Sequence, residues 1–189
     1  MNVGTPQTIT WQGHEIKTAF RKSPVNGPVE FFGVNLVGDD QADRRVHGGD
    51  RKAVYVYPFE HYSFWCQELG LEKLPFGSFG ENLTSSGWLE RDACIGDCVR
   101  IGTAEFVVVS PRKPCYKLEA AFQRPDMIRR FHRARLSGFY LGGRKPGRVA
   151  PGDSVELLSR EHGAPSIAET YALYADAAGL PRETTPEAL

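Results

Sequence analysis

One segment of the chain surrounds a cysteine with cations and prolines. Val109-Ser-Pro-Arg-Lys-Pro-Cys-Tyr-Lys117 indicates a strand end that turns through two prolines into a helix starting near Cys115. There, backbone N–H groups, the helix dipole and the side chains of Arg112, Lys113 and Lys117 would stabilise a thiolate. A thiolate is both a nucleophile and a ligand for a soft metal. Cys115 is therefore the leading candidate for chemistry, although such a cysteine more often serves as a small hydrophobic residue.

Two further clusters could contribute to a binding site. Arg44-Arg-Val-His-Gly-Gly-Asp-Arg51 places basic side chains beside a Gly-Gly pair, whose backbone freedom permits close approach to a phosphate or another anion. Phe79-Gly-Glu-Asn-Leu83 offers a carboxylate and an amide to a ligand ring. Taken alone, each cluster is also compatible with an ordinary turn between strands.

Aromatic and titratable groups gather near a predicted junction between a strand and a helix. Tyr55, Tyr57, His61 and Tyr62 could form the walls of a pocket, or equally an aromatic cluster in the core. The chain contains no GxGxxG, Walker, HExxH or GxSxG motif, which removes the main sequence support for nucleotide-cofactor folds, zinc peptidases and common serine hydrolases. Cysteine hydrolase chemistry stays open as an alternative.

The elements that must position these residues are mostly short strands. Gly and Pro punctuate β-branched and aromatic runs, which predicts strands that include Val29–Val37, Ala53–Tyr57, Cys98–Ile101, Glu105–Ser110 and Ser154–Leu158. Helical spacing predicts three helices among them, over Phe59–Leu69, Cys115–Phe122 and Asp126–Arg135. We therefore expect a mixed α/β fold, mainly β, with a barrel-like sheet that carries helical insertions.

The strand pattern stops near Arg160. Ser166-Ile-Ala-Glu169 has the spacing of a capping box and predicts a helix from Ile167 to about Ala178. We expect one domain over residues 1–160, followed by a short C-terminal helical extension and tail over residues 161–189.

Bulk properties exclude several classes of partner. The formal net charge is +0, from 23 basic and 23 acidic residues, so no global field attracts nucleic acid or an anionic membrane. No apolar run reaches the roughly 20 residues that span a bilayer, and the N-terminal residues lack a secretory pattern. We expect a cytoplasmic protein with reduced cysteines, no nucleic-acid partner and no membrane partner.

Taken in order, several motifs resemble the successive signature blocks of the MOSC domain family. They are Val46-His-Gly-Gly49, Phe79-Gly-Glu-Asn-Leu83, Ile95-Gly-Asp97, Pro111-Arg-Lys-Pro-Cys-Tyr-Lys-Leu118 and Gly138-Phe-Tyr140. Together they span most of the chain and are far more specific than any one motif. The greatest similarity is to the stand-alone bacterial YiiM-type members of this family.

The resemblance implies a β-barrel-like domain that binds the molybdenum cofactor, with Cys115 as the protein ligand of the metal. Two electrons would pass through molybdenum to the N–O bond of an N-hydroxylated compound, such as a hydroxylaminopurine or an amidoxime. The predicted cofactor-binding residues are His47, Gly48, Gly49, Arg51, Phe79, Gly80, Glu81, Asn82, Arg112, Lys113, Tyr116, Lys117 and Tyr140. Among these, Arg51, Arg112, Lys113 and Lys117 are inferred from charge alone.

The sequence has no flavin, haem or iron–sulfur motif, so we expect a separate flavin or iron–sulfur reductase to supply the electrons. Two alternatives stay open. Cys115 could carry a persulfide or deliver the cofactor. The resemblance implies pyridoxal phosphate binding for the family only, and this sequence shows no pyridoxal-phosphate domain, so sulfur would need an external donor. The cleft could also bind another anionic ligand without redox chemistry. YiiM-type members carry about three C-terminal helices, whereas this chain shows one, and the oligomeric state is not predicted.

Overall fold

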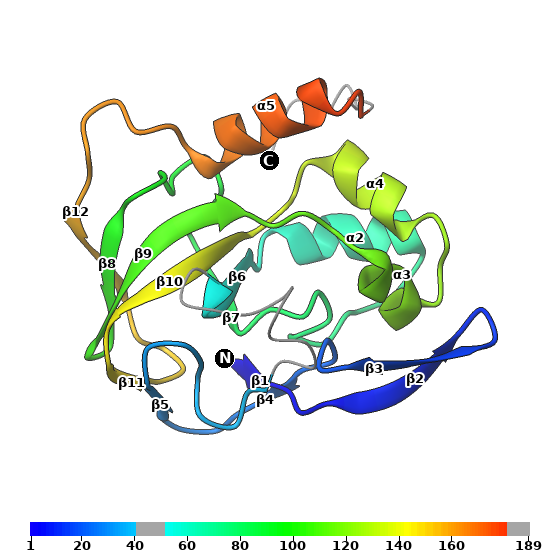
Figure 1. Ribbon diagram of the computed structural model, residues 1–189, viewed down its shortest axis with the longest axis horizontal. Coiled ribbons are helices and arrows are strands. Elements are labelled where there is room, and N and C mark those ends of the chain that lie inside the picture. Colours follow the sequence, from blue (N-terminus) through cyan, green and yellow to red (C-terminus); the bar gives the residue numbers. More distant parts are fainter. Residues whose placement is uncertain (41–51, 181–189) are drawn as a thin grey trace.

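A computed structural model describes residues 1–40 and 52–180 of the chain. The predicted site residues His47, Gly48, Gly49 and Arg51 lie outside the described residues. The largest sheet has six strands in the order β12-β8-β9-β10-β6-β7 and curls into a half-barrel (Figure 1). Neighbouring strands are antiparallel except for β6 and β7, which are parallel. Their bounds are β6 Val54–Pro58, β7 Leu83–Ser85, β8 Cys98–Ile101, β9 Ala104–Pro111, β10 Phe139–Lys145 and β12 Val155–Ser159.

Three two-stranded sheets complete the β structure. They pair β1 (Asn2–Val3) with β4 (Ser23–Pro24), β2 (Gln7–Trp11) with β3 (His14–Thr18), and β5 (Val29–Phe31) with β11 (Gly147–Val149). The β2–β3 hairpin turns at Gln12 and Gly13, both with positive φ, as a tight hairpin turn requires.

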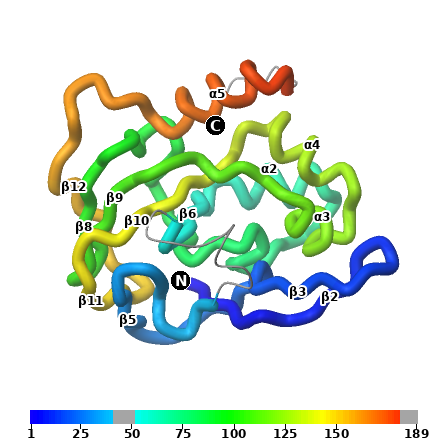
Figure 2. The backbone as a smooth tube through the Cα atoms, in the orientation of Figure 1, coloured from blue at the N-terminus to red at the C-terminus, as the bar shows by residue number. Residues whose placement is uncertain are grey.

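The helices α2 (His61–Leu69), α3 (Tyr116–Phe122) and α4 (Met127–Ala134) gather at one end of the sheet. Helix α5 (Ile167–Ala177) lies on the opposite side of the molecule from the β2–β3 hairpin (Figure 2). None of the described helices combines the length and the apolar character that a membrane span needs.

Strand β6 divides the core because all five of its residues are buried. Successive side chains of a strand point to opposite faces, so Val54 and Val56 enter one apolar cluster while Tyr55 and Tyr57 enter another. The valine side packs inside the curled sheet with Phe106, Phe139 and other apolar residues. The tyrosine side is an aromatic cluster between the sheet and the helices, and it forms the floor beneath Cys115.

The buried tyrosines of β6 have hydrogen-bond partners, which removes the cost of an unpaired buried hydroxyl. The Tyr55 hydroxyl donates to the carbonyl of Ser137 at 2.8 Å, and the Tyr57 hydroxyl donates to the carbonyl of Leu136 at 3.2 Å. Both contacts fix the turn that precedes β10. Gly138 in this turn has φ 59°, and a Cβ there would lie 2.4 Å from the Val56 carbonyl oxygen, so glycine is required.

The predicted mixed, mainly β fold with helical insertions is confirmed, and the four predicted helices are present within one or two residues of their expected ends. The predicted strand Val29–Val37 is wrong beyond Phe31, because Gly33 at φ 84° turns the chain back. Strand β10 was absent from the predicted strands because Gly142 and Gly143 resemble a turn signal. Gly143 is instead needed for packing, since a Cβ there would lie 2.3 Å from the Gly33 carbonyl oxygen.

Helix α5 begins with the predicted capping box: the Ser166 hydroxyl accepts from the Glu169 N–H, and the Glu169 carboxylate accepts from the Ser166 N–H. Its side chains then contact α4 through Tyr171, whose hydroxyl lies 2.8 Å from His132 Nδ1. Arg135 also donates to Asp176 at 3.0 Å. The boundary at residue 160 between domain and extension stays a prediction.

The buried contact between His132 and Tyr171 predicts pH-dependent stability. Burial, together with the nearby Arg135, lowers the pKa of His132 below 6.5. The unfolded chain therefore binds a proton more readily, so the contribution to stability is complete above pH 6.5 and is lost as the pH falls through the folded-state pKa. We expect the free energy of unfolding to fall more steeply between pH 7 and pH 5 in the wild type than in His132→Gln. An unchanged slope in His132→Gln would contradict this, and His14→Gln on exposed β3 is the control.

Candidate functional site

Cys115 lies in the turn between strand β9 and helix α3. Strand β9 ends at Pro111, helix α3 begins at Tyr116, and Cys115 is the extended N-cap residue between them, with φ −137°. Its carbonyl accepts the N–H of Leu118 at 2.8 Å, while its thiol is free and partly exposed. Because α3 has only seven residues, we attribute the electrostatics around the thiol to side-chain cations rather than to the helix dipole.

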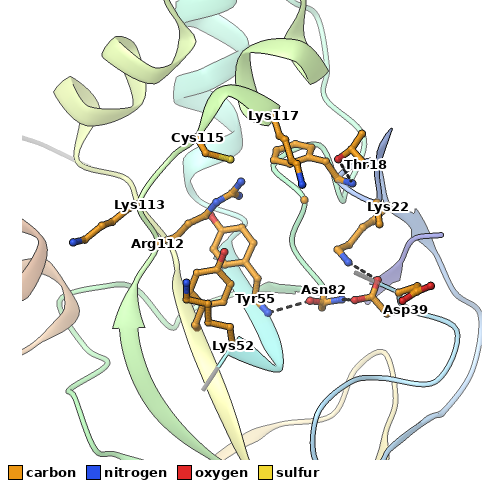
Figure 3. A pocket seen from close by; sticks show the side chains of 15 residues that line it. Thr18, Lys22, Asp39, Lys52, Tyr55, Asn82, Arg112, Lys113, Cys115 and Lys117 are labelled. Atoms are coloured by element: carbon orange, nitrogen blue, oxygen red, sulfur yellow. Dashed lines mark hydrogen bonds and ion pairs between the residues drawn. The ribbon is translucent and has the colours of Figure 1, made fainter. Parts of the chain in front are cut away.

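The thiol faces a pocket built from segments far apart in the chain (Figure 3). The turn between β9 and α3, together with α3 itself, supplies one wall. Strands β6 and β10 supply the floor, and the segments after β3 and before residue 41 supply the other wall. Fifteen residues line it: Thr18, Ala19, Phe20, Lys22, Asp39, Asp40, Lys52, Tyr55, Gly80, Asn82, Arg112, Lys113, Cys115, Lys117 and Tyr140. Five of them are cations and two are carboxylates, so the lining favours an anionic ligand.

The guanidinium of Arg112 is fixed beneath the thiol. It donates to the carbonyl of Phe79 and lies 4.5 Å from the ring centre of Tyr55 and 5.0 Å from that of Phe20. Figure 3 shows the group pointing towards the sulfur of Cys115. Burial opposes its charge, but Tyr55, Tyr140 and Cys115 outweigh this effect and raise the pKa of Arg112 above its usual value. Arg112 therefore keeps a permanent positive charge next to the thiol.

Lys117 is a largely buried residue whose ammonium has no ion-pair or hydrogen-bond partner in the described part of the chain. Only 9% of the residue is exposed, and Figure 3 shows its ammonium directed into the pocket. Within residues 1–40 and 52–180, no side chain or carbonyl forms an ion pair or hydrogen bond with it. The ammonium nitrogen is not among the buried polar atoms that lack a partner, so it is open to the pocket. An accessible ammonium that holds no carboxylate favours an anionic group in this part of the pocket.

The opposite wall carries a compensated cation. Lys22 forms an ion pair with Asp39, and the side chains are 8% and 2% exposed, respectively. Asp39 also accepts the Gly4 N–H at 2.8 Å and the Asn82 side-chain amide at 2.8 Å. The Asn82 amide oxygen in turn accepts the N–H of Tyr55 at 3.0 Å. This chain of contacts joins the N-terminal segment to β6 and fixes the shape of the pocket.

Glu81 has a structural position behind the pocket wall. Its fully buried carboxylate accepts the N–H groups of Gly77 at 2.6 Å and Phe79 at 3.1 Å, the Thr84 hydroxyl at 3.0 Å, and the Tyr62 hydroxyl. Burial raises the pKa of Glu81 above its usual value, although these donors act in the opposite direction. Glu81 thus holds the loop that presents Gly80 and Asn82 to the pocket.

The structure brings together seven of the predicted site residues: Gly80, Asn82, Arg112, Lys113, Cys115, Lys117 and Tyr140. Three others lie elsewhere. Phe79 is buried in the aromatic cluster, Glu81 faces its own loop, and Tyr116 is 49% exposed outside the pocket lining. Lys113 is at the rim but points away from Cys115, with its ammonium 3.7 Å from the ring centre of Tyr174 on α5.

The aromatic and titratable residues of β6 and α2 divide between the pocket wall and the core. Tyr55 belongs to the aromatic cluster and also lines the pocket, whereas Tyr57 and Tyr62 lie in the cluster without lining the pocket. His61 is buried, and its Nε2 lies 2.7 Å from a Glu90 carboxylate oxygen.

Sequence reasoning did not identify Thr18, Lys22, Asp39, Asp40 or Lys52 as pocket residues. No motif marks them. Only the fold brings the segment after β3 beside the loop that contains Asn82. Among the described residues, no group of three or more His, Cys, Asp or Glu side chains could hold a metal ion.

Comparison with known proteins identifies the family. The model of the MOSC domain matches residues 43–156. The chain belongs to the MOSC domain family. MOSC domains are generally linked to the molybdenum cofactor, and in this member the matched range contains Asn82, Arg112, Cys115, Lys117 and Tyr140, whereas Lys22 and Asp39 precede it.

The relatives are YiiM-like MOSC proteins. The chain is 43% identical over 160 residues to the uncharacterized protein YflK of Bacillus subtilis (strain 168), covering 85% of this chain and 72% of YflK. It is 36% identical to protein YiiM of Escherichia coli (strain K12) over 76% of this chain and 65% of YiiM. The crystal structure of YiiM from Geobacillus stearothermophilus aligns with a TM-score of 0.76 and 32% identity, covering 97% of this chain and 91% of that one.

A fungal relative is named for its activity. A protein called "Reductase" from Gibberella moniliformis (strain M3125 / FGSC 7600) is 34% identical over 79% of this chain, but the match covers only 27% of that protein. The match therefore concerns one part of a much longer protein.

The MOSC loop around Glu81 supports a stability prediction. In Glu81→Gln, the amide NH2 cannot accept hydrogen bonds, so part of the buried set of donors loses its acceptor. We expect the free energy of unfolding to fall by about 2–4 kcal/mol in chemical denaturation. Glu161→Gln, at an exposed position, should change it by no more than about 0.5 kcal/mol. Equal effects of the two substitutions would show that Glu81 does not hold the loop.

Proposed function

We propose that this protein is an oxidoreductase that holds a molybdenum–pterin cofactor through Cys115 and reduces N-hydroxylated compounds. One observation carries the proposal: the free thiol of Cys115 lies in a pocket where the Arg112 guanidinium and the Lys117 ammonium face the same space. This arrangement combines a soft metal ligand with positive charge for an anionic group.

The residues fit such a cofactor chemically. A thiolate is a suitable further ligand for a high-valent molybdenum already bound by dithiolene sulfurs. The pterin carries a phosphate, for which a lysine ammonium or an arginine is the usual partner in proteins. Lys117 and Arg112 would bind that anionic portion, and Cys115 would bind the metal. Gly80 would allow close approach of a flat ring, since its backbone has φ 78° and no side chain.

When bound, the cofactor would supply a two-electron couple for reduction of the N–O bond. The protein's own residues would set the surroundings of that reaction. Burial raises the pKa of Tyr140, so its hydroxyl stays protonated at neutral pH, where it can donate a hydrogen bond to a substrate. The permanent charge of Arg112 would attract an anionic part of the cofactor or substrate to the space beside Cys115.

The relatives support reduction at the level of the family. The name of the fungal relative is that of a reductase, and the relatives named YiiM share the fold. We propose that an external flavin or iron–sulfur reductase supplies the electrons and that a small N-hydroxylated molecule is the substrate. The activities of longer relatives are attributed to this chain only as part of this proposal.

Sulfur transfer is the second candidate function. The partial exposure of Cys115 at the rim favours it, because an external sulfur donor could reach the thiol. Cys115 would then carry a persulfide, and pterin would not be needed.

The proposal predicts that cofactor content depends on Cys115. Wild type and Cys115→Ser should be produced in a host supplied with molybdenum and purified without oxygen. We expect near-stoichiometric molybdenum and pterin in the wild type, loss of most of both in Cys115→Ser, and reduction of benzamidoxime by reduced methyl viologen with the wild type only. The substitution replaces the soft thiolate with a poorer ligand for molybdenum, so the protein should hold the cofactor less tightly.

Cys66→Ser is the matched control, because Cys66 lies on α2 outside the pocket and is also partly exposed. It should retain metal, pterin and activity. Absence of pterin from the wild type would contradict the proposal. If the wild type instead gained the mass of one sulfur atom on Cys115 after treatment with a sulfur donor, sulfur transfer would replace it.

A further inference from the structure

The ion pair of Lys22 and Asp39 forms a pocket wall, and the proposed binding of the cofactor does not use it. Both side chains are almost completely buried. A buried ion pair is seldom more stabilising than well-packed apolar residues of similar size, so its presence in a pocket points to chemistry rather than to stability.

Asp39 is held rigidly in place. One carboxylate oxygen accepts the Gly4 N–H at 2.8 Å and contacts the Lys22 ammonium, and the other accepts the Asn82 amide at 2.8 Å. Asn82 is itself fixed by the N–H of Tyr55 at 3.0 Å. The carboxylate therefore cannot rotate away, and it keeps the Lys22 ammonium at the edge of the cavity.

The ammonium reaches the pocket from the side opposite Cys115. Figure 3 shows Lys22 and Asp39 across the cavity from the thiol, with Lys117 between them along the upper wall. A ligand that contacts Cys115 with one part would therefore present another part, or a second molecule, to Lys22.

The other basic side chains are less suited to proton transfer. Arg112 keeps its proton at any physiological pH and is occupied by the Phe79 carbonyl. Lys113 points away towards Tyr174. Lys117 has no carboxylate partner among residues 1–40 and 52–180 that could stabilise it through a cycle of proton loss and gain.

The charged groups that face Lys22 have opposing effects on its pKa. Asp39 and Glu81 favour its ammonium form, whereas Arg112 disfavours it. Asp40 and Lys117 also line the same cavity. Burial is the largest influence, and it lowers the pKa of Lys22 below 10.5 despite the contact with Asp39. Lys22 is thus a stronger acid than an exposed lysine, which favours its use as a proton donor.

Building on the proposed function, we propose that Lys22 is a catalytic residue that donates a proton to the departing oxygen when the N–O bond of the substrate is reduced. For an amidoxime, two electrons and two protons convert the C=N–OH group into C=N–H and water. The N–O bond breaks, one new N–H bond forms, and the oxygen leaves as water. Lys22 supplies one proton and solvent the other, while the reduced cofactor, reloaded by a flavin or iron–sulfur reductase, supplies both electrons.

Two substitutions at Lys22 separate proton donation from charge. Lys22→Arg keeps the positive charge beside Asp39 but cannot release a proton at working pH, and Lys22→Met removes both. We expect Lys22→Arg to contain as much molybdenum and pterin as the wild type and to lose about 100- to 10,000-fold in kcat for benzamidoxime with reduced methyl viologen. We expect kcat of the wild type to decline at high pH as Lys22 loses its proton, and this decline should be absent from Lys22→Arg.

Two further variants serve as references. Lys17→Met, on the exposed face of β3, should match the wild type in cofactor content, kcat and pH profile. Lys117→Met should lose cofactor content, since Lys117 is assigned to the anionic part of the ligand.

The outcomes distinguish this inference from the function on which it depends. A wild type without molybdenum or pterin removes the proposed function itself. If the wild type is active and Lys22→Arg retains both kcat and the pH profile, positive charge is sufficient and the role of Lys22 as proton donor is overturned. If Lys22→Arg and Lys22→Met lose activity only in proportion to lost cofactor, Lys22 is a cofactor-binding residue and the inference is equally overturned.

Discussion

The pocket depends on the hydrogen bonds that Asn82 makes to three separate segments. Its backbone N–H donates to Tyr55 at 2.8 Å, its carbonyl accepts the Asn2 N–H at 2.6 Å, and its side chain bridges Tyr55 and Asp39. Because each partner is buried, loss of any of these contacts would leave a polar group unpaired in the interior. One residue thus joins the N-terminal strand, strand β6 and the wall opposite Cys115.

A second constraint gives the pocket its charge. The aromatic cluster on the tyrosine side of β6 provides flat surfaces on which Arg112 lies, so a guanidinium can be buried without a carboxylate beside it. Lys117 is buried nearby without a partner in the described part of the chain. Arg112 and Lys117 therefore concentrate positive charge in one part of the pocket. This local excess explains how a chain with a net charge of +0 can still favour an anionic ligand.

Local patterns predicted the elements that carry Cys115 because the relevant signals are short in range. Prolines 111 and 114 mark the turn, the following spacing marks α3, and Ser166 with Glu169 marks the start of α5. Strand β10 escaped prediction because its glycines are required by packing against Phe31 and Gly33, a contact between distant segments. The same reason hid Lys22 and Asp39: no local pattern shows that residues near the N-terminus reach the cysteine. Phe79 and Glu81 lie in the loop that also carries Gly80 and Asn82, but tertiary packing directs their side chains away from the pocket.

The central claim is that the Cys115 sulfur is a ligand of molybdenum, and X-ray absorption at the molybdenum edge tests it most directly. The protein should be isolated with its metal, and the spectrum of the wild type should be compared with that of Cys115→Ser reconstituted with the same cofactor. The account predicts one sulfur neighbour more in the wild type than in the variant, at a bond length typical of a thiolate. An identical number of sulfur neighbours in the two proteins would show that Cys115 does not bind the metal.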